Sequence, residues 1–165
     1  MTDKLFHIAY HPIGTIRSPF KEPKGTPIQP VAAQGVAGTV EVLADYGEGL
    51  KDLEGFSHIV LLYHFHLSRD YKLLVTPFLD DVPRGLFATR APKRPNPIGL
   101  SVVRLVSVEG NILHIRNVDI VDGTPLLDIK PFVPYFEPQD GVRFGWLEGK
   151  SDVAASRRAD QRFVT

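Results

Sequence analysis

An asparagine held between two prolines is the feature of this sequence with the clearest capacity for chemistry. It lies in the segment Arg94-Pro95-Asn96-Pro97-Ile98-Gly99-Leu100-Ser101. Each proline fixes its own φ and forces the preceding residue into an extended geometry, so this loop is stiff before any ligand binds. The amide of Asn96 can accept from an exocyclic amine and donate to a ring nitrogen, which suits the edge of an adenine. Asn96 is therefore a candidate recognition residue, and a decorated turn into the next strand is the alternative.

Positive charge gathers around the same loop. No acidic residue lies between Val82 and Val108, whereas this stretch contains Arg84, Arg90, Lys93, Arg94 and Arg104. The whole chain has 19 basic and 19 acidic residues. Because the net charge is zero, a local basic run is a candidate site for phosphate or carboxylate groups. A solvated basic edge strand is the alternative.

Histidines are the next candidates. In the segment 57–67 the odd positions from Ile59 to Phe65 are apolar, and the even positions include His64 and His66. A strand here would have one core face and one face that carries imidazoles. The two histidines could bind zinc, but the sequence marks no third ligand, so we predict no metal site. Histidines at the end of a buried strand more often line a pocket.

Two other segments stand out. The segment 26–33 (Thr-Pro-Ile-Gln-Pro-Val-Ala-Ala) combines proline stiffness with small side chains, which lets a ligand approach the backbone. Asp128 is a lone carboxylate in an apolar run, and a half-buried carboxylate needs a partner. That partner is either Lys130 or an arginine, in a structural role, or a ligand group.

The elements that must position these residues are short. Runs rich in Val, Ile, Leu and Phe, separated by prolines and glycines, predict strands over residues 6–16, 38–43, 57–65, 85–89, 100–108, 112–118 and 124–129. Glu109-Gly110-Asn111 predicts a tight hairpin. We expect a helical turn over 47–53 and a polar helix over 151–161. Many short strands with little helix favour an antiparallel barrel or sandwich.

The composition of the chain excludes several classes of function. The 165 residues contain no cysteine, which removes disulfides and thiol chemistry. Dinucleotide, Walker, Gly-x-Ser-x-Gly and His-Glu-x-x-His signatures are absent. We expect one domain over 1–150, a short polar tail over 151–165, no membrane segment and a cytoplasmic protein.

Five sequence blocks together resemble the TsaA-like family, whose characterised members include the TrmO-type tRNA methyltransferases. They are Pro12–Pro19, Gly55–His58, Gly85–Arg90, Arg94–Ser101 and Val121–Pro131. The blocks occur in order, between about residue 7 and residue 145. The resemblance implies an all-β protein, a single-sheeted antiparallel β-barrel with short helical segments that acts as a homodimer. It also implies that S-adenosylmethionine binds near the subunit interface, and that its methyl group goes to N6 of threonylcarbamoyl-modified adenosine beside the tRNA anticodon.

The resemblance also implies a set of site residues. The cofactor would contact Pro30, Val31, Ala32, His66, Leu67, Arg90, Leu100, Leu126, Leu127, Asp128 and Ile129. At Leu67, where some relatives have a polar residue, only a backbone or apolar contact is expected. Some bacterial relatives also continue into a further C-terminal domain.

Methyl transfer to N6 assigns provisional roles to other residues. Asn96 would orient the N6 proton, and the proton acceptor would be Asp128, His66 or bulk water. Arg84, Lys93 and Arg94 would hold phosphates of the anticodon loop, so tRNA binding would weaken steeply with salt. Two alternatives stay open at this point. One is a methyltransferase with a different acceptor, and the other is a non-catalytic module that binds S-adenosylmethionine or RNA.

Overall fold

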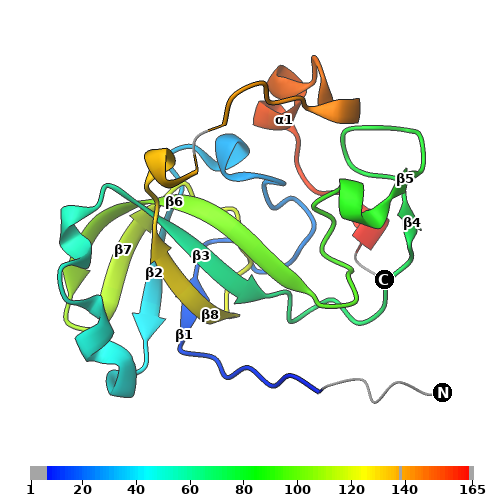
Figure 1. Cartoon of the computed structure of the whole chain (residues 1–165). Helices are drawn as coiled ribbons and strands as arrows, with labels where there is room; N and C mark the ends of the chain where they lie inside the picture. The colour runs from blue at the N-terminus through cyan, green and yellow to red at the C-terminus, as the bar shows by residue number, and fades with distance from the viewer. Residues whose placement is uncertain (1–6, 138, 164–165) are drawn as a thin grey trace.

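A closed six-stranded barrel forms the body of the protein in the computed structural model, which describes residues 7–137 and 139–163 (Figure 1). Around the barrel the strands are β1 (Gly14–Arg17), β2 (Ala37–Val42), β7 (Ile112–Arg116), β6 (Ile98–Glu109), β3 (His58–His64) and β8 (Thr124–Pro131). Every neighbouring pair is antiparallel. Closure pairs all six strands on both sides and leaves no free sheet edge. The expected antiparallel barrel is confirmed, and the sandwich alternative is wrong.

The core of the barrel follows from alternation along the strands. In β3 the side chains alternate between half-buried and buried, and Ile59, Leu61 and Tyr63 point inward. Inward residues of the other strands complete one apolar cluster, which includes Ile16, Val40, Val103, Leu105, Leu113, Ile115 and Leu126. Period-two patterning in the sequence is therefore what sets the inner face of the barrel.

The register of β3 brings β6 and β8 to either side of it. Leu62 pairs with Leu100 on one side and with Asp128 on the other. The register between β3 and β8 then shifts, because Tyr63 pairs with Leu126. Leu127 is thus an extra residue in β8. A bulge of this kind re-aims the side chains that flank it.

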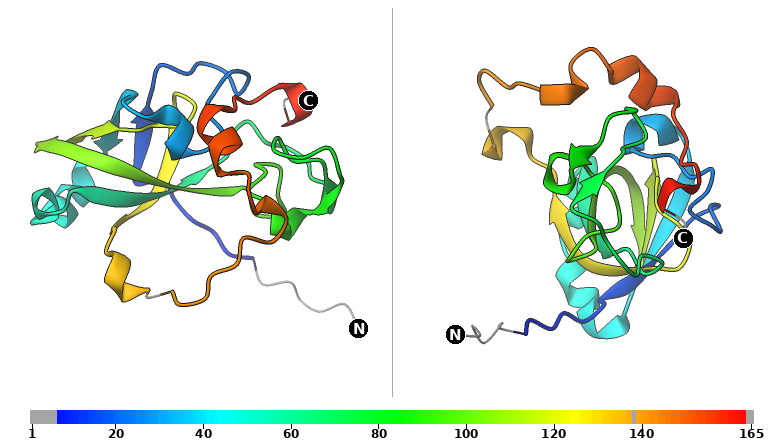
Figure 2. Two further views of the ribbon diagram at one scale, coloured as in Figure 1. Left: turned by 90° about the horizontal axis from the view of Figure 1, so that it is seen from above. Right: turned by 90° about the vertical axis from the view of Figure 1, so that its right-hand side faces the viewer.

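The two ends of the barrel are covered differently (Figures 1 and 2). We call one the loop end, because the segments 18–36, 65–97 and 117–123 connect strands there. We call the other the turn end, because the 3-10 helices η2 (Ala44–Leu50) and η3 (Leu53–Gly55) lie there between β2 and β3. The β6–β7 hairpin at Gly110, with φ of 59°, is also at the turn end.

Several short elements lie at the loop end. They are η1 (Pro30–Ala33), the two-stranded sheet of β4 (Leu74–Val75) and β5 (Arg84–Gly85), and η4 (Leu86–Ala88). After β8 the chain forms η5 (Pro134–Phe136), η6 (Gly145–Leu147), α1 (Ser151–Ser156) and η7 (Gln161–Phe163). Figure 2 shows this last part of the chain returning across the loop end.

The returning segment, residues 145–163, makes defined contacts, and we call it the strap. The Gly25 N–H donates to Ala159 O over 2.8 Å, and the Ala159 N–H donates to Thr26 O over 2.9 Å. The indole N–H of Trp146 donates to Ala88 O over 2.8 Å. At the end of the strap, Phe163 packs against the small cluster of Val75, Leu86 and Ala91. The polar tail expected after residue 150 therefore packs on its own chain.

Three of the predicted elements differ from the structure. The strand over 85–89 is wrong, because β5 has only β4 as a partner and Thr89 closes a 3-10 turn with bonds from its N–H and hydroxyl to Leu86 O. The first strand begins at Gly14, where pairing to β2 and β8 starts; Phe6 lies outside the described residues. The helix expected over 151–161 is α1 alone, followed by a bridge between Pro27 and Arg158.

Within the described ranges, no helix is long and apolar enough to cross a membrane. Nor do any three histidines or acidic residues in these ranges gather as metal ligands would.

Candidate functional site

The proline-flanked loop of Asn96 lies beside the end of β3. The Phe65 N–H donates to Pro97 O over 2.8 Å, and the Ile98 N–H donates to Asn96 O over the same distance. These two bonds fix the backbone at Asn96 and at the two residues after it, and Asn96 itself is exposed. The predicted cofactor residues His66 and Leu67 directly follow Phe65, so the structure brings them next to this loop.

His66 is oriented by the first residue of β8. Its Nδ1 lies 3.4 Å from the Thr124 hydroxyl. That hydroxyl donates its own proton to Val121 O over 2.7 Å, so it accepts from the imidazole. This assigns the proton to Nδ1 and leaves Nε2 as an acceptor. Burial, with a smaller contribution from His64, lowers the pKa of His66, so the ring is neutral at pH 7.

Arg90 links the loop end to η1. Its guanidinium donates to Gln29 Oε1 over 3.1 Å, directly before the predicted cofactor residues Pro30, Val31 and Ala32. Ala32 is buried, whereas Val31 is 57% exposed and presents an apolar surface. Arg90 and η1 come from segments far apart in the chain, and the fold places them together.

The remaining predicted cofactor residues lie on β6 and β8. Leu100 and Asp128 flank Leu62 on the outer face of the sheet, so their backbones are two strand spacings, about 10 Å, apart. Leu126 is fully buried in the core. Its carbonyl already accepts from the Ile13 N–H over 2.8 Å, so its contact with a cofactor stays a prediction. Leu127 and Ile129 are half-buried.

Asp128 is paired with Lys130, one of the structural partners that the sequence analysis considered. Lys130 Nζ lies 2.7 Å from its Oδ2, and the Ile129 N–H donates to Oδ1 over 2.9 Å. Both members of the ion pair are well exposed, so the pair contributes little to stability. A catalytic role for Asp128 stays a prediction.

The basic residues predicted to hold phosphates are partly engaged within the chain. Arg84 forms an ion pair of 2.6 Å with Asp80, which lies just before the acid-free stretch, and its guanidinium lies 5.5 Å from the ring centroid of Trp146. Arg94 donates to Thr89 O over 2.9 Å and to Ala91 O over 3.2 Å. Arg94 therefore fixes the turn that carries Arg90, a role that the sequence did not indicate.

A buried polar chain at the loop end was missed from the sequence. The Tyr63 hydroxyl lies 2.9 Å from Ser101 Oγ, and Ser101 Oγ donates to Asp119 Oδ1 over 2.7 Å. Since Ser101 gives its proton to the carboxylate, Tyr63 donates to Ser101. The signal was present, because a tyrosine on the core face of a strand requires a partner for its hydroxyl. No local sequence pattern indicated that Asp119 accepts the last hydrogen bond of this polar chain.

Burial makes Asp119 an unusual carboxyl group. It raises the pKa to about 6, while the Ser101 hydrogen bond and the positive charge of Arg90 act in the opposite direction. The same burial raises the pKa of Tyr63, and the Asp119 charge adds to it. The positive charge of Arg90 thus acts on both Asp119 and Tyr63. Because Arg90 also donates to Gln29, it connects the start of η1 with the buried polar chain.

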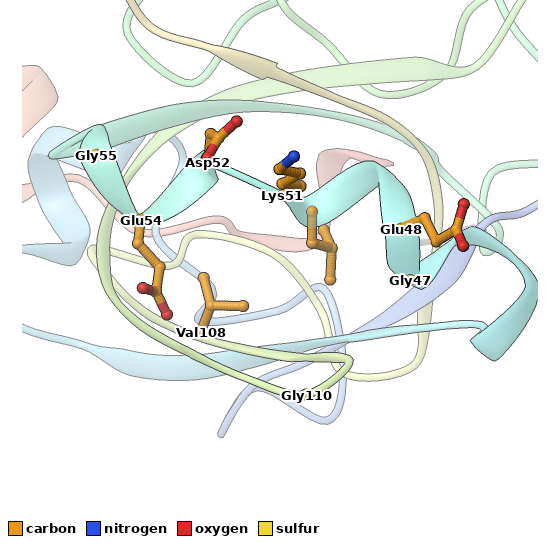
Figure 3. Close-up of a pocket in the computed structure, with 9 residues that line it drawn as sticks. Gly47, Glu48, Lys51, Asp52, Glu54, Gly55, Val108 and Gly110 are labelled. Atoms are coloured by element: carbon orange, nitrogen blue, oxygen red, sulfur yellow. The ribbon is translucent and has the colours of Figure 1, made fainter.

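Two hollows in the surface lie toward the turn end. The first, of about 640 Å³, is lined mainly by η2 and η3, with Val108 and Gly110 on its far side (Figure 3). None of the predicted site residues lines it. The second, of about 560 Å³, includes Asp128 and Ile129 beside Ile13 and Phe56. The predicted residues therefore divide between the loop end, where most lie, and this second hollow.

Comparison with known proteins identifies the family of the chain. Residues 15–138, more than half of the chain, match the family model described as the tRNA-methyltransferase O N-terminal domain. A probable S-adenosyl-L-methionine-binding protein of Pyrococcus abyssi is 60% identical over 96% of this chain and 86% of its own length. The tRNA (adenine(37)-N6)-methyltransferase of Escherichia coli K12 is 38% identical over 92% of this chain and 69% of its own length.

A solved structure gives the same fold. The crystal structure of TrmO from Pseudomonas aeruginosa superposes with a TM-score of 0.74 at 40% identity, over 89% of this chain. This chain covers 64% of that protein, which is less than two thirds of its length. Fold, sequence blocks and family match coincide over the barrel, and the chain therefore belongs to the tRNA-methyltransferase O N-terminal domain family, as its resemblance to TsaA-like proteins predicted.

Proposed function

We propose that this protein transfers a methyl group from S-adenosylmethionine to N6 of the adenosine beside the tRNA anticodon, in its threonylcarbamoyl-modified form. Membership of the family and the activity named for the Escherichia coli relative support the reaction class. The structural observation that carries the proposal is that several of the predicted site segments lie together at the loop end. There the Asn96 loop is hydrogen-bonded to the end of β3, and Arg90 is hydrogen-bonded to Gln29 before η1.

The residues at the loop end suit a donor with an apolar part. Val31 and Leu100 present exposed apolar side chains, at 57% and 48% exposure. When bound, S-adenosylmethionine supplies an electrophilic methyl group on a positively charged sulfur.

This chain's own residues would align and shield the reacting atoms. The small residues of η1, together with Leu100, bind the donor and exclude water. Asn96, on its stiff loop, accepts a hydrogen bond from the N6–H of the adenine and turns the nitrogen lone pair toward the methyl group. Holding reactants in line in this way supplies a large part of the rate enhancement in two-substrate reactions.

We also propose that a second copy of the chain completes the site. The outer face of β6 exposes Ile98, Leu100 and Val106, at 42%, 48% and 55%. Further exposed apolar side chains follow β8: Phe132, Tyr135, Phe136 and Phe144. Apolar surface of this extent is typical of protein interfaces, and Leu100 belongs both to it and to the predicted cofactor site. Light scattering should give the mass of a dimer.

Transfer RNA would approach over Lys93 and Arg90. Arg84 and Arg94 are engaged with groups of their own chain, so we assign the phosphate contacts chiefly to Lys93. As a tRNA-modifying enzyme, the protein would act in the cytoplasm.

The test is direct. The full chain is incubated with methyl-labelled S-adenosylmethionine and tRNA, prepared with or without the threonylcarbamoyl group, and the nucleosides are analysed by mass spectrometry. We expect labelled N6-methylated product only from the modified tRNA. Label in unmodified tRNA or in a small acceptor would change the substrate. Binding of the donor without any labelled nucleoside would identify a binding module and overturn the proposed reaction.

Asn96→Ala tests the named residue. We expect the transfer rate to fall about 100-fold, because the hydrogen bond that orients N6 is lost, while calorimetry gives an unchanged affinity for S-adenosylmethionine. Asn111→Ala is the matched control, since Asn111 is an amide at the turn end. Equal losses of rate and affinity at Asn96 would remove it from the chemistry.

A further inference from the structure

Asp119 is a carboxylate at the loop end whose function the fold alone does not explain. It lies in the connection between β7 and β8, and its Oδ1 accepts a hydrogen bond of 2.7 Å from Ser101. Ser101 is the one side chain among the described residues that hydrogen-bonds it. A half-buried carboxylate with so few donors costs stability unless a ligand supplies another N–H or a positive charge.

The surroundings of Asp119 are those of the proposed site. Ser101 directly follows Leu100 on β6, but its side chain points into the barrel whereas that of Leu100 points outward. Tyr63, which donates to Ser101, pairs with Leu126 across β3 and β8. The charge of Arg90 acts on Asp119 and Tyr63 alike. Leu126 thus neighbours the polar chain in register, and Arg90, another predicted cofactor residue, acts on Asp119 through its charge.

We propose that Asp119 is the catalytic residue that receives the N6 proton during methyl transfer. This inference rests on the proposed function and deepens it. As the bond between N6 and the methyl carbon forms, the bond between that carbon and sulfur breaks, and the sulfur keeps the electron pair. The single N6 proton, which the Asn96 amide oxygen orients by a hydrogen bond before transfer, moves to the Asp119 carboxylate and is later released to water. No other reactant is needed.

The other candidates are less well placed for this role. Asp128 is well exposed and ion-paired to Lys130 over 2.7 Å, so its charge is already compensated. His66 has Nε2 available, but its lowered pKa makes it a weaker base than an ordinary histidine. Asp119 has the opposite shift. Burial raises the pKa to about 6, which strengthens the carboxylate as a base and still leaves it mostly ionised at neutral pH.

The test is the pH profile of single-turnover methyl transfer to modified tRNA. For the unsubstituted protein we expect the rate to fall below about pH 6, as Asp119 becomes protonated. Asp119→Asn keeps the shape and can still accept from Ser101. It should lower the rate by about 100-fold or more and abolish this acid limb, while calorimetry shows a similar affinity for S-adenosylmethionine.

Ser101→Ala is a second test, because a purely structural role of Asp119 would not predict a shift in the pH profile of this variant. The Ser101 hydrogen bond lowers the pKa of Asp119, so its removal should move the acid limb to higher pH. The phenol of Tyr63 and the guanidinium of Arg90 are the groups that act on Asp119, and side chains of these two types keep their protons between about pH 5 and 8. Carbon-13 NMR of the Asp119 carboxyl should report the same shift in the free protein.

Asp122→Asn is the matched control, because Asp122 lies in the same connection but bonds Ser18 and Lys21. It should leave the pH profile unchanged. An acid limb that survives Asp119→Asn, or a rate that stays close to that of the unsubstituted protein, would overturn the inference. If the limb then disappears in His66→Gln, the proton acceptor is His66. If the unsubstituted protein transfers no methyl group although the Asp119 carboxyl titrates near pH 6, the proposed function has failed.

Discussion

The two ends of the barrel differ in how their polar groups are held. At the turn end, η2 and η3 surround the larger hollow with glycines and with flexible side chains such as Glu48 and Glu54 (Figure 3). At the loop end, the buried Tyr63 and Ser101 and the half-buried Asp119 form a continuous chain of hydrogen bonds. The larger hollow is thus not where the chemistry gathers. Rigid polar groups with little water around them are better suited to catalysis than an open depression.

The largest effect is expected at Gly99, where β6 passes closest to Tyr63. A Cβ at this position would overlap the buried Tyr63 ring, which is also packed edge-on against Phe65. Gly99→Ala should cost about 3 kcal/mol of unfolding free energy, measured by urea denaturation, because the ring must shift. It should also separate Tyr63 from Ser101 and lower methyl transfer.

Gly14→Ala gives the comparison at the turn end. The added Cβ would meet the Glu41 carbonyl, so it should destabilise to a similar extent. Folded Gly14→Ala protein, assayed at low temperature, should retain transfer activity. A loss equal to that of Gly99→Ala would break the distinction between the two ends.

Asp119→Asn should stabilise the protein at pH 8. The pKa of Asp119 is about 6 in the folded protein, whereas the ordinary value for an aspartate in an unfolded chain is 3.8, so protonation favours the folded state. The wild-type protein therefore loses stability as pH rises from about 4 through 6. Asparagine avoids this loss, and the gain at pH 8 should be about 2 kcal/mol. Thermal unfolding at pH 4 and pH 8 measures it; an equal effect at both pH values would contradict the assignment.

Trp146→Ala tests how the strap holds the loop end. The substitution removes the hydrogen bond to Ala88 and the contacts of Arg84 and Lys150 with the indole ring. We expect a loss of about 1 to 2 kcal/mol in unfolding free energy. Hydrogen exchange should rise in residues 84–94 and 145–163 and stay constant in η2 and η3. Uniform exchange over both ends would contradict a local role.

The smallest effect is expected for a pair of lysines. Lys93→Ala should reduce by about 1 the slope of log tRNA affinity against log salt concentration, because one phosphate contact is lost. Lys51→Ala, at the turn end, is the matched control and should leave the slope unchanged. Fluorescence anisotropy at several salt concentrations gives both values. An equal change in the two variants would place the RNA outside the loop end.

Much of the barrel could be predicted from the sequence because its signals are local. Alternating apolar residues in β3 set the inner face, and Gly110 sets the β6–β7 hairpin. The strand expected over 85–89 failed for a non-local reason. These residues are apolar enough for a strand, but the barrel is closed without them, and only the two residues of β4 pair with β5.

The candidate site could be predicted only where the residue types themselves make the backbone rigid. Proline fixes φ whatever the surroundings, so the sequence by itself determined the stiff loop of Asn96 and the segment before η1, and alternation determined the inward face of β3. Tertiary structure alone decided which charges are available and which are compensated. It paired Arg84 with Asp80, turned Arg94 onto backbone carbonyls and joined Asp119 to Ser101. Local sequence fixes torsion angles, whereas burial and electrostatic partners depend on residues that only the closed barrel brings together.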